Sequence, residues 1–186
     1  MINSPFSSEF YTVFPAPNAD ELISSIEEVC NTKKVDNDFY EWVKYCKVDT
    51  IPLIWQDFQD LLKPSLEILS QKLKKNFEYT MYNPWLNLYK RGYYQEIHDH
   101  VIHDISCVFF VNTGIDFGKF FFMDRNSSNL SKEYKDLISY MDHHEPTIKK
   151  GDIIFFSSRL LHGVTSHEND EIRKTLSVNF NIKLVK

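Results

Sequence analysis

Cysteine is scarce in this chain, and so are the features that mark secreted or membrane proteins. The three cysteines, Cys30, Cys46 and Cys107, are widely spaced and odd in number, which is typical of reduced thiols in a cytosolic protein. The first residues lack a basic segment followed by an apolar one, so we expect no secretory signal. No apolar run approaches the roughly 20 residues that a membrane helix needs. We therefore expect a soluble, cytoplasmic protein.

An excess of basic residues is also absent. The net charge is -5 and the pI is about 5.8, so DNA binding driven by bulk charge is not expected. A local basic groove is the alternative that these numbers still allow. Apolar residues make up 42% and aromatic residues 15% of the chain, which is enough for a core and argues against disorder. We find no repeat, low-complexity segment or linker in the 186 residues, and we expect one domain spanning residues 1–186.

The first part of the chain has helical periodicity. Apolar residues recur at helical spacing after Asn18 and Asp20, either of which can cap a helix. A short helical piece is expected over residues 39–46. A second long helical stretch covers residues 54–77, where Pro64 marks either a kink or the first turn of a new helix.

From residue 79 the pattern changes to short segments rich in aromatic and β-branched residues, which predict strands. These segments are residues 79–92, 105–112, 118–124, 151–158 and 174–185. The polar residues 126–150 between them predict a long loop with a helical turn, and we expect a lid or substrate-recognition role for it. The predicted fold is mainly β with N-terminal helices (α+β): a helical part, residues 1–78, packs on a jelly-roll core, residues 79–186.

Three of the seven histidines fall within the stretch "HDHVIH". In an extended strand, His98 and His100 point to one face and Asp99 to the other. Two imidazoles on one face can converge on a transition-metal ion, and the apolar run from residue 105 is expected to continue the same strand into the core. Taken alone, the pattern also fits a solvated strand end.

A second group of candidates lies far along the chain. His162 follows the apolar strand "GDIIFFSS", and Arg173 opens the last strand, in which every second residue is apolar. Imidazole ligates iron, and guanidinium holds a carboxylate through two parallel hydrogen bonds. Arg173 alone also fits a surface arginine that forms weak ion pairs with the acidic residues before it.

Taken together, these motifs resemble the iron(II)/2-oxoglutarate dioxygenases, and most closely their compact phage and bacterial members. The resemblance covers residues 85–180, and the first 80 residues match only loosely. The matching residues are Trp85, Asn87, Tyr89, Gly92, Gln95, His98, His100, Ser106, Val108, Gly151, Asp152, Phe156, His162, Arg173, Thr175, Ser177, Asn179 and Phe180.

The resemblance implies a double-stranded β-helix that uses Fe(II), 2-oxoglutarate and O2, with hydroxylation of the substrate as the expected outcome. His98, His100 and His162 would be the iron ligands, and Arg173 would hold the far carboxylate of 2-oxoglutarate. The residues expected to line the cosubstrate pocket are Tyr89, Asn87, Ser177 and Thr175. For Tyr89 and Asn87, which we expect on a strand paired with the His98 strand, ordinary barrel lining is the alternative.

The motif departs from the family at His100, because most members have a carboxylate at that position. Either three neutral histidines bind the metal, or a carboxylate arrives from elsewhere, with Asp104 the nearest candidate. A cupin-like metal protein or dioxygenase that does not use 2-oxoglutarate is the main competing function. A non-catalytic structural or binding domain is the third.

The other histidines carry weaker signals. We expect His103 in a loop, and His143, His144 and His167 in solvated polar segments. The substrate stays open among protein side chains, nucleobases and small metabolites, and so does the oligomeric state. If a phage encodes the protein, the host cytoplasm is its expected location.

Overall fold

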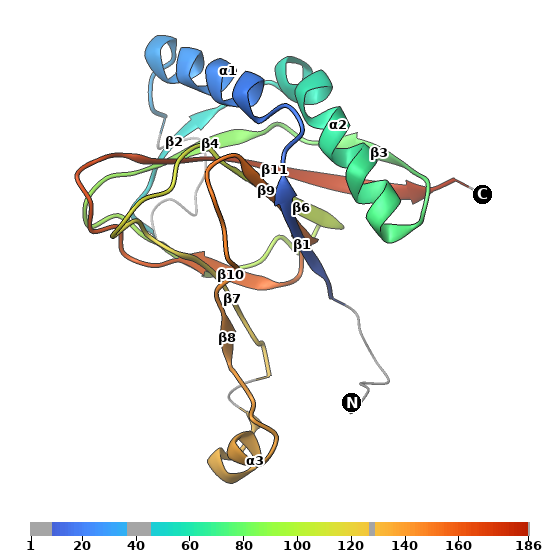
Figure 1. Cartoon of the computed structure of the whole chain (residues 1–186), viewed down its shortest axis with the longest axis vertical. Helices are drawn as coiled ribbons and strands as arrows, with labels where there is room; N and C mark the ends of the chain where they lie inside the picture. The colour runs from blue at the N-terminus through green and yellow to red at the C-terminus, as the bar shows by residue number, and fades with distance from the viewer. Residues whose placement is uncertain (1–8, 37–45, 127–128, 186) are drawn as a thin grey trace.

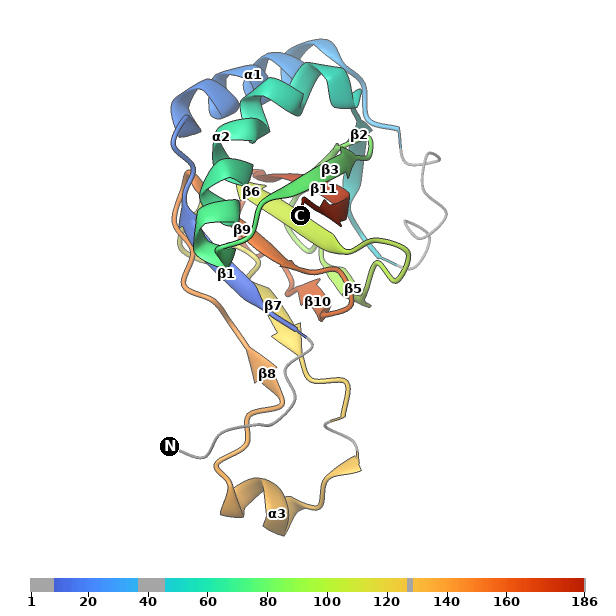
Figure 2. The ribbon, with the colours of Figure 1, turned by 90° about the vertical axis from the view of Figure 1, so that its right-hand side faces the viewer.

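Two facing β-sheets form the body of the protein in the computed structural model, which describes residues 9–36, 46–126 and 129–185 (Figures 1 and 2). The helices are α1 (Ala19–Thr32), α2 (Trp55–Leu73) and α3 (Lys132–Leu137). The strands are β1 (Tyr11–Pro15), β2 (Asp49–Pro52), β3 (Phe77–Met81), β4 (Trp85–Tyr89), β5 (Gln95–His98), β6 (Ile105–Phe110), β7 (Phe120–Met123), β8 (His143–His144), β9 (Asp152–Ser157), β10 (Leu161–Val164) and β11 (Arg173–Leu184). None of the helices in these ranges is long and apolar enough to cross a membrane.

The strands pair antiparallel throughout both sheets. The larger sheet has the order β1-β9-β6-β11-β4-β2, and β3 pairs with the C-terminal half of β11. The smaller sheet has the order β5-β10-β7-β8. Two antiparallel sheets around one interior make a double-stranded β-helix, so the predicted mainly β jelly roll with N-terminal helices is confirmed.

Helices α1 and α2 lie over the outer face of the larger sheet (Figure 2). Leu22 and Ile26 of α1 and Leu62 of α2 are completely buried. They pack in one apolar cluster with Phe109 and Leu176 of the sheet. Spacing of three or four residues puts apolar side chains on one helix face, and each such burial stabilises the fold by about 1.5–3 kcal/mol.

Alternation along β11 gives the larger sheet two different faces. Leu176, Val178 and Phe180 belong to the apolar cluster beneath the helices. Successive side chains of a strand point to opposite faces, so Arg173 and Thr175 point into the space between the sheets, where both line a cavity. Because apolar residues alternate along β11 and face the helices, the residues between them, including the positively charged Arg173, face the interior between the sheets.

The N-terminal part was predicted to be helical, but it also contains two strands. β1 and β2 join opposite edges of the larger sheet. The two strands pair with β9 and β4, which lie far along the chain, so local sequence patterns carry little signal for them. The predicted change to strands at residue 79 is late by two residues, since β3 begins at Phe77.

Two details of the predicted helices also differ. Asn18 occupies the N-cap position of α1, but its side chain donates to the Leu61 carbonyl (2.9 Å) and does not cap the helix. Pro64 lies inside one helix, Trp55–Leu73, and does not start a new one. The short helical piece expected at residues 39–46 lies outside the described residues except for Cys46.

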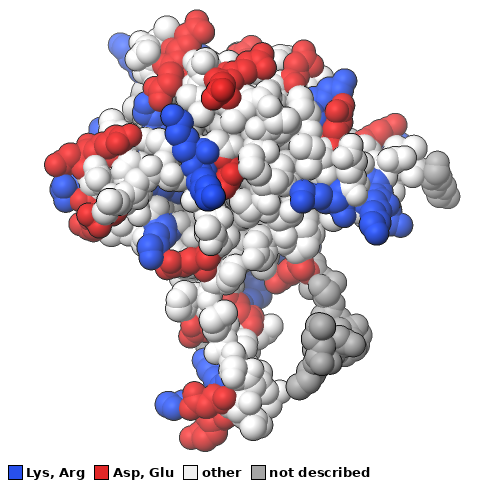
Figure 3. Space-filling view, in the orientation of Figure 1, with Lys and Arg blue, Asp and Glu red and all other residues white. Residues whose placement is uncertain are grey.

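The predicted polar segment 126–150 contains β8, which pairs with β7 at the edge of the smaller sheet, and α3, which lies beyond that edge, away from the body of the protein (Figures 1 and 2). His143 and His144 of β8 are exposed, as expected. Acidic and basic side chains are interspersed on the face in Figure 3, and its described residues form no continuous basic surface.

The expectation that His167 is solvated is wrong, because its side chain is completely buried. Its Nδ1 accepts a hydrogen bond from the Gly118 backbone N–H (3.1 Å), and its Nε2 donates to the Glu171 carbonyl (2.7 Å). The ring also packs edge-on against Phe117 (4.8 Å between centroids). The charged residues around His167 suggested a solvated turn, but the ring itself joins two loops at one end of the barrel.

We therefore expect His167→Ala to lower the free energy of unfolding by about 2–5 kcal/mol, because it leaves a buried donor and a buried acceptor without their partner. His143→Ala, at an exposed position, is the matched control and should change it by less than about 0.5 kcal/mol. Urea unfolding followed by circular dichroism measures both. Equal stability of the two variants would contradict the structural role of His167.

Candidate metal centre

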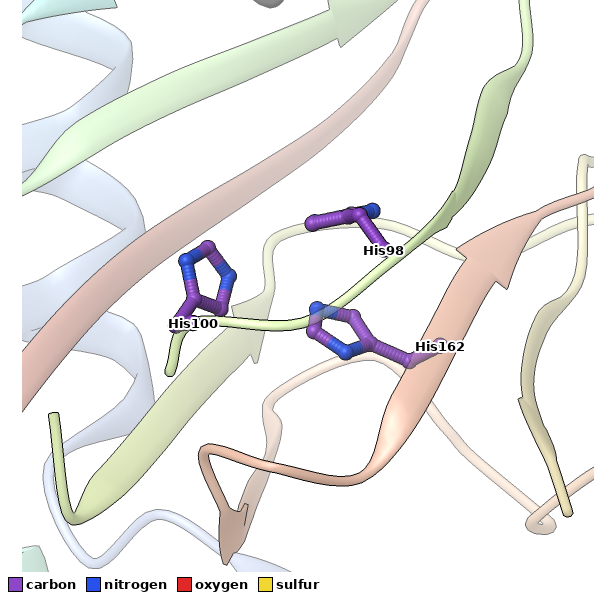
Figure 4. Close-up of side chains that lie close together, drawn as sticks. All are labelled: His98, His100 and His162. Carbon is purple, nitrogen blue, oxygen red and sulfur yellow. The ribbon is translucent and has the colours of Figure 1, made fainter. Parts of the chain in front are cut away.

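The structure brings His98, His100 and His162 together from two strands and a turn (Figure 4). His98 ends β5 and lies opposite His162 of β10 in the strand register. The ring centroids are 4.3 Å apart for His98 and His162, and 5.1 Å apart for His98 and His100. The candidate ligand nitrogens of all three lie within 4.8 Å of one another, a spacing that lets them hold one metal ion.

His100 reaches the cluster differently from the prediction. Strand β5 ends at His98, and the next strand, β6, belongs to the other sheet. The expectation that one strand carries both histidines and continues into the core is therefore wrong. The His100 backbone N–H donates to the Ser158 carbonyl (2.8 Å), which holds the turn in place after β5 ends.

Backbone carbonyls orient two of the imidazoles. Nδ1 of His98 lies 2.8 Å from the Glu96 carbonyl, and Nδ1 of His162 lies 2.8 Å from the Leu160 carbonyl. Because a carbonyl only accepts, each Nδ1 carries the proton and Nε2 keeps its lone pair for a ligand. Both rings are thus fixed in the tautomer that a metal requires.

The third imidazole contacts an amide. Nδ1 of His100 lies 3.5 Å from Nδ2 of Asn179, whose Oδ1 accepts from the Ser106 hydroxyl (2.8 Å). Nitrogen and oxygen of an amide side chain exchange places when it turns by half a rotation. In the structure, the amide nitrogen of Asn179 faces Nδ1 of His100 as a donor, and only the turned amide would accept a hydrogen bond from Nδ1–H and give His100 the tautomer of the other two rings.

Burial keeps the three histidines neutral at pH 7. It lowers the pKa of His98, and it lowers the pKa of His100 to about 3, with smaller contributions from His98 and His103. The pKa of His162 lies well below its usual value, mainly because of burial and then because of the two neighbouring histidines. Neutral imidazole is the form that binds a metal, so no deprotonation is needed at pH 7.

Neither aspartate near the motif joins the cluster. Asp99 accepts a hydrogen bond from Arg125, as expected for a side chain that points away from His98. Asp104 accepts from the Ile182 backbone N–H (2.8 Å). Within the described ranges, the group around this centre consists of three histidines without a carboxylate.

Arg125 connects the two chain segments that carry the histidines. Its guanidinium pairs with Asp99, which stands between His98 and His100. The same Nη2 donates to the Arg159 carbonyl (3.1 Å), in the loop that leads to His162. The Arg125 guanidinium therefore stabilises the positions of both histidine-bearing segments through its contacts with Asp99 and Arg159.

Arg173 is buried, with 3% of its surface exposed, so the surface-arginine alternative is wrong. Its guanidinium lies over the ring of Tyr89 (4.7 Å) and near that of Phe110 (5.6 Å). No hydrogen-bond partner for its Nη1 is present among the described residues. A buried charge without an anionic partner is costly, so the site fits a ligand that brings a carboxylate.

The other predicted pocket residues line the same cavity as Arg173 and the three histidines. They are Tyr89, Asn87, Thr175 and Ser177. Asn87 donates to the Ser177 hydroxyl (3.0 Å). We expected the strand of Tyr89 and Asn87, β4, to pair with β5. Instead β4 belongs to the opposite sheet and reaches the cavity from there.

Gln95 and Asn179 also belong to this site; both are among the residues that match the family motif, but no role was expected for either. Tyr89 donates to Oε1 of Gln95 (2.5 Å), and Nε2 of Gln95 lies 3.3 Å from Nε2 of His98. Burial raises the pKa of Tyr89, so its hydroxyl stays protonated and donates. The alternation of β11 was a usable signal for Asn179, which points to the same side as Arg173.

Comparisons with known proteins agree with this geometry. Residues 83–181 match the family model described as "Putative 2OG-Fe(II) oxygenase". No curated protein matches the chain. Among solved structures, an oxidoreductase of the 2OG-Fe(II) oxygenase family from Burkholderia pseudomallei has a TM-score of 0.69 at 11% identity, over 92% of this chain and 84% of that one.

Two further solved structures are similar in fold. HygX from Streptomyces hygroscopicus, with nickel, 2-oxoglutarate and hygromycin B bound, has a TM-score of 0.66 at 9% identity, over 92% of this chain and 82% of that one. A Pseudomonas putida prolyl-4-hydroxylase has a TM-score of 0.61 at 15% identity, over 94% of this chain and 93% of that one. At these identities the likeness concerns the fold.

We expect His98→Ala and His162→Ala to abolish stoichiometric Fe(II) binding and to leave the far-ultraviolet circular dichroism unchanged, because each removes one of three ligands. His100→Asp should still bind iron, since a carboxylate replaces the imidazole. Metal content after anaerobic loading and desalting measures this. His103→Ala, whose ring packs on Tyr82 outside the cluster (4.4 Å), is the control and should bind like the wild type.

We expect Arg125→Met and Asp99→Asn each to weaken Fe(II) affinity about 3- to 10-fold, because outer contacts that orient ligands contribute to metal affinity. The double variant should be no weaker than either single variant, since the two residues act through one contact. Arg91→Met, which removes an exposed ion pair with Asp170, is the control. Additive losses in the double variant would show that the pair does not act as a unit.

Proposed function

The chain belongs to the 2OG-Fe(II) oxygenase family, and from this premise we propose that it hydroxylates its substrate. Enzymes of the family require Fe(II), 2-oxoglutarate and O2, so the chain is a 2-oxoglutarate-dependent dioxygenase. When bound, iron and cosubstrate supply the oxidation: one atom of O2 enters a substrate C–H bond as hydroxyl, and the other enters succinate as carbon dioxide leaves.

The observation that carries the proposal is the buried guanidinium of Arg173 in the same cavity as three neutral histidines. A cupin-like metal site has no use for a buried guanidinium whose Nη1 has no hydrogen-bond partner among the described residues. A dicarboxylate cosubstrate that chelates a metal with its 2-oxo acid end brings its far carboxylate to such a cation. The two parallel N–H groups of a guanidinium suit that carboxylate.

In this proposal, His98 and His162 would hold the iron through Nε2, and His100 would supply the third imidazole nitrogen. Arg173 holds the far carboxylate of 2-oxoglutarate, and its position over Tyr89 keeps the guanidinium plane in one orientation. The side chains that line the space between these two ends are Asn87, Thr175 and Ser177. The apolar rings beyond them exclude water from the reacting centre.

Three neutral ligands leave the metal one charge unit more positive than two histidines and a carboxylate do. A more positive centre attracts the dianionic cosubstrate more strongly and changes the redox tuning of the metal. We propose that the three-histidine set is the native one, because Asp99 and Asp104 are both engaged elsewhere.

We also propose that residues 1–186 act as one unit in the cytoplasm. The substrate class stays open among protein side chains, nucleobases and small metabolites. The lid role of residues 126–150 stays a prediction, and protection of their amide hydrogens on addition of 2-oxoglutarate and substrate would support it.

Anaerobic titration of the Fe(II) protein with 2-oxoglutarate tests the function through the visible absorption band of the chelate. We expect Arg173→Ala to weaken 2-oxoglutarate affinity on the order of 30- to 1,000-fold, because a charge-assisted bidentate contact contributes roughly 2–4 kcal/mol. Arg173→Lys should recover only part of this loss, since an ammonium group lacks the fork of a guanidinium.

Iron affinity should barely change in either variant, because Arg173 is not a ligand. Arg91→Ala, which removes an exposed arginine, is the matched control and should bind 2-oxoglutarate like the wild type. If Arg173→Ala binds 2-oxoglutarate as tightly as the wild type, the cosubstrate assignment is wrong and the cupin-like function becomes the better one.

A further inference from the structure

A second cleft adjoins Arg173, and none of the three histidines lines it. It has a volume of about 330 Å³, and its walls include Lys119, Glu145 and Thr147 beside Arg173 itself. We call it the Arg173 cleft. The cavity that contains the histidines has only about 20 Å³ of comparable space, which is room for roughly one water molecule. Side chains that line this cavity must therefore move when a five-carbon diacid enters it.

Two residues line both spaces, Arg173 and Phe120. Phe120 is 5% exposed, and its ring lies 5.7 Å from that of His162 and 6.1 Å from that of Phe110. One aromatic ring and one guanidinium are therefore walls that the two spaces share. Rotation of an aromatic side chain between rotamers is a small local movement compared with opening of the barrel.

We propose that the Arg173 cleft is the route by which the dicarboxylate cosubstrate reaches the metal centre and by which the dicarboxylate product leaves. This inference rests on the proposed function. A diacid that enters from this side passes Arg173 with its 2-oxo acid end first and leaves its trailing carboxylate beside the guanidinium. The histidine end of the cavity then stays free for the substrate.

The charges at the cleft favour a dianion although the chain as a whole carries a net charge of -5. Lys119 adds a second cation near Arg173, and its Nζ lies 3.0 Å from Oε2 of Glu145 across the cleft. The Lys119 side chain is 67% exposed and that of Glu145 40%, so water screens this ion pair. A weak pair at the entrance can exchange its carboxylate for that of an incoming diacid.

Stopped-flow measurement of 2-oxoglutarate association and dissociation with the anaerobic Fe(II) protein tests the route. Thr147 lines the cleft and is exposed, so Thr147→Trp narrows the entrance without disturbing the core. We expect both rate constants to fall on the order of tenfold while Kd stays within about twofold. A route that is narrowed slows both directions equally, whereas a lost contact changes Kd.

Ile102→Trp is the matched control, because Ile102 follows His100 at the opposite end of the cavity and is 78% exposed. It should leave both rate constants unchanged. Lys119→Ala should lower the association rate constant about 3-fold at low salt and reduce its salt dependence. Lys132→Ala on α3, which removes another exposed ion pair, should do neither.

Three results would overturn the inference: unchanged rate constants in Thr147→Trp, a weaker Kd in Thr147→Trp with an unchanged association rate, or slow association in Ile102→Trp. The last result would place the entrance at the histidine end. Failure of the proposed function is distinguishable from these, because the wild-type protein would then give no chelate band with 2-oxoglutarate at all.

Discussion

The register between β5 and β10 is the constraint on which the metal centre depends, because it sets His98 directly opposite His162. A slip of one residue would turn the His162 side chain to the outer face of the sheet. The adjacent pairing of β10 with β7 limits such a slip, since Phe122 lies opposite His162 on that side. His100 then needs only a short turn, anchored to Ser158, to complete the cluster.

The barrel interior is divided between an apolar and a polar part, and this division explains how it can hold an ionic ligand. Phe110, Phe122 and Phe156 belong to an apolar cluster between the sheets. On β11, by contrast, small hydroxyl and amide side chains face inward and bond to side chains of the neighbouring strands β4 and β6. Ser106 bridges Asn179 and Ser158 with two 2.8 Å hydrogen bonds. Buried polar groups that satisfy each other in this way cost little stability.

Much of this arrangement could be predicted from local patterns. The alternation of apolar residues from Leu176 onward predicts both the strand β11 and the inward direction of Arg173. The pair His98 and His100, with a distant His162, predicts the cluster, although not the turn that separates its first two members. Strands β1 and β2 could not be found, because their stability comes from partners distant in sequence.

His167 shows a different limit of sequence reasoning. Its neighbours are charged, and charge indicates exposure for the segment but not for each residue in it. A single imidazole can satisfy a donor and an acceptor in loops that meet only in the folded chain, here at Gly118 and Glu171. Burial of a polar side chain inside a polar segment therefore depends on tertiary contacts that no local pattern contains.

The two ends of the site, Arg173 and the histidines, are connected through protein side chains. Arg173 packs on the Tyr89 ring, Tyr89 donates to Gln95, and Gln95 lies against the ligand nitrogen of His98. A metal that takes this nitrogen must displace the Gln95 amide from it. The Gln95 amide would keep its hydrogen bond from the Tyr89 hydroxyl, so its oxygen stays satisfied whether or not a metal is bound. The group that would hold a metal and the group that would hold a carboxylate are therefore coupled through one chain of side-chain contacts between the two sheets.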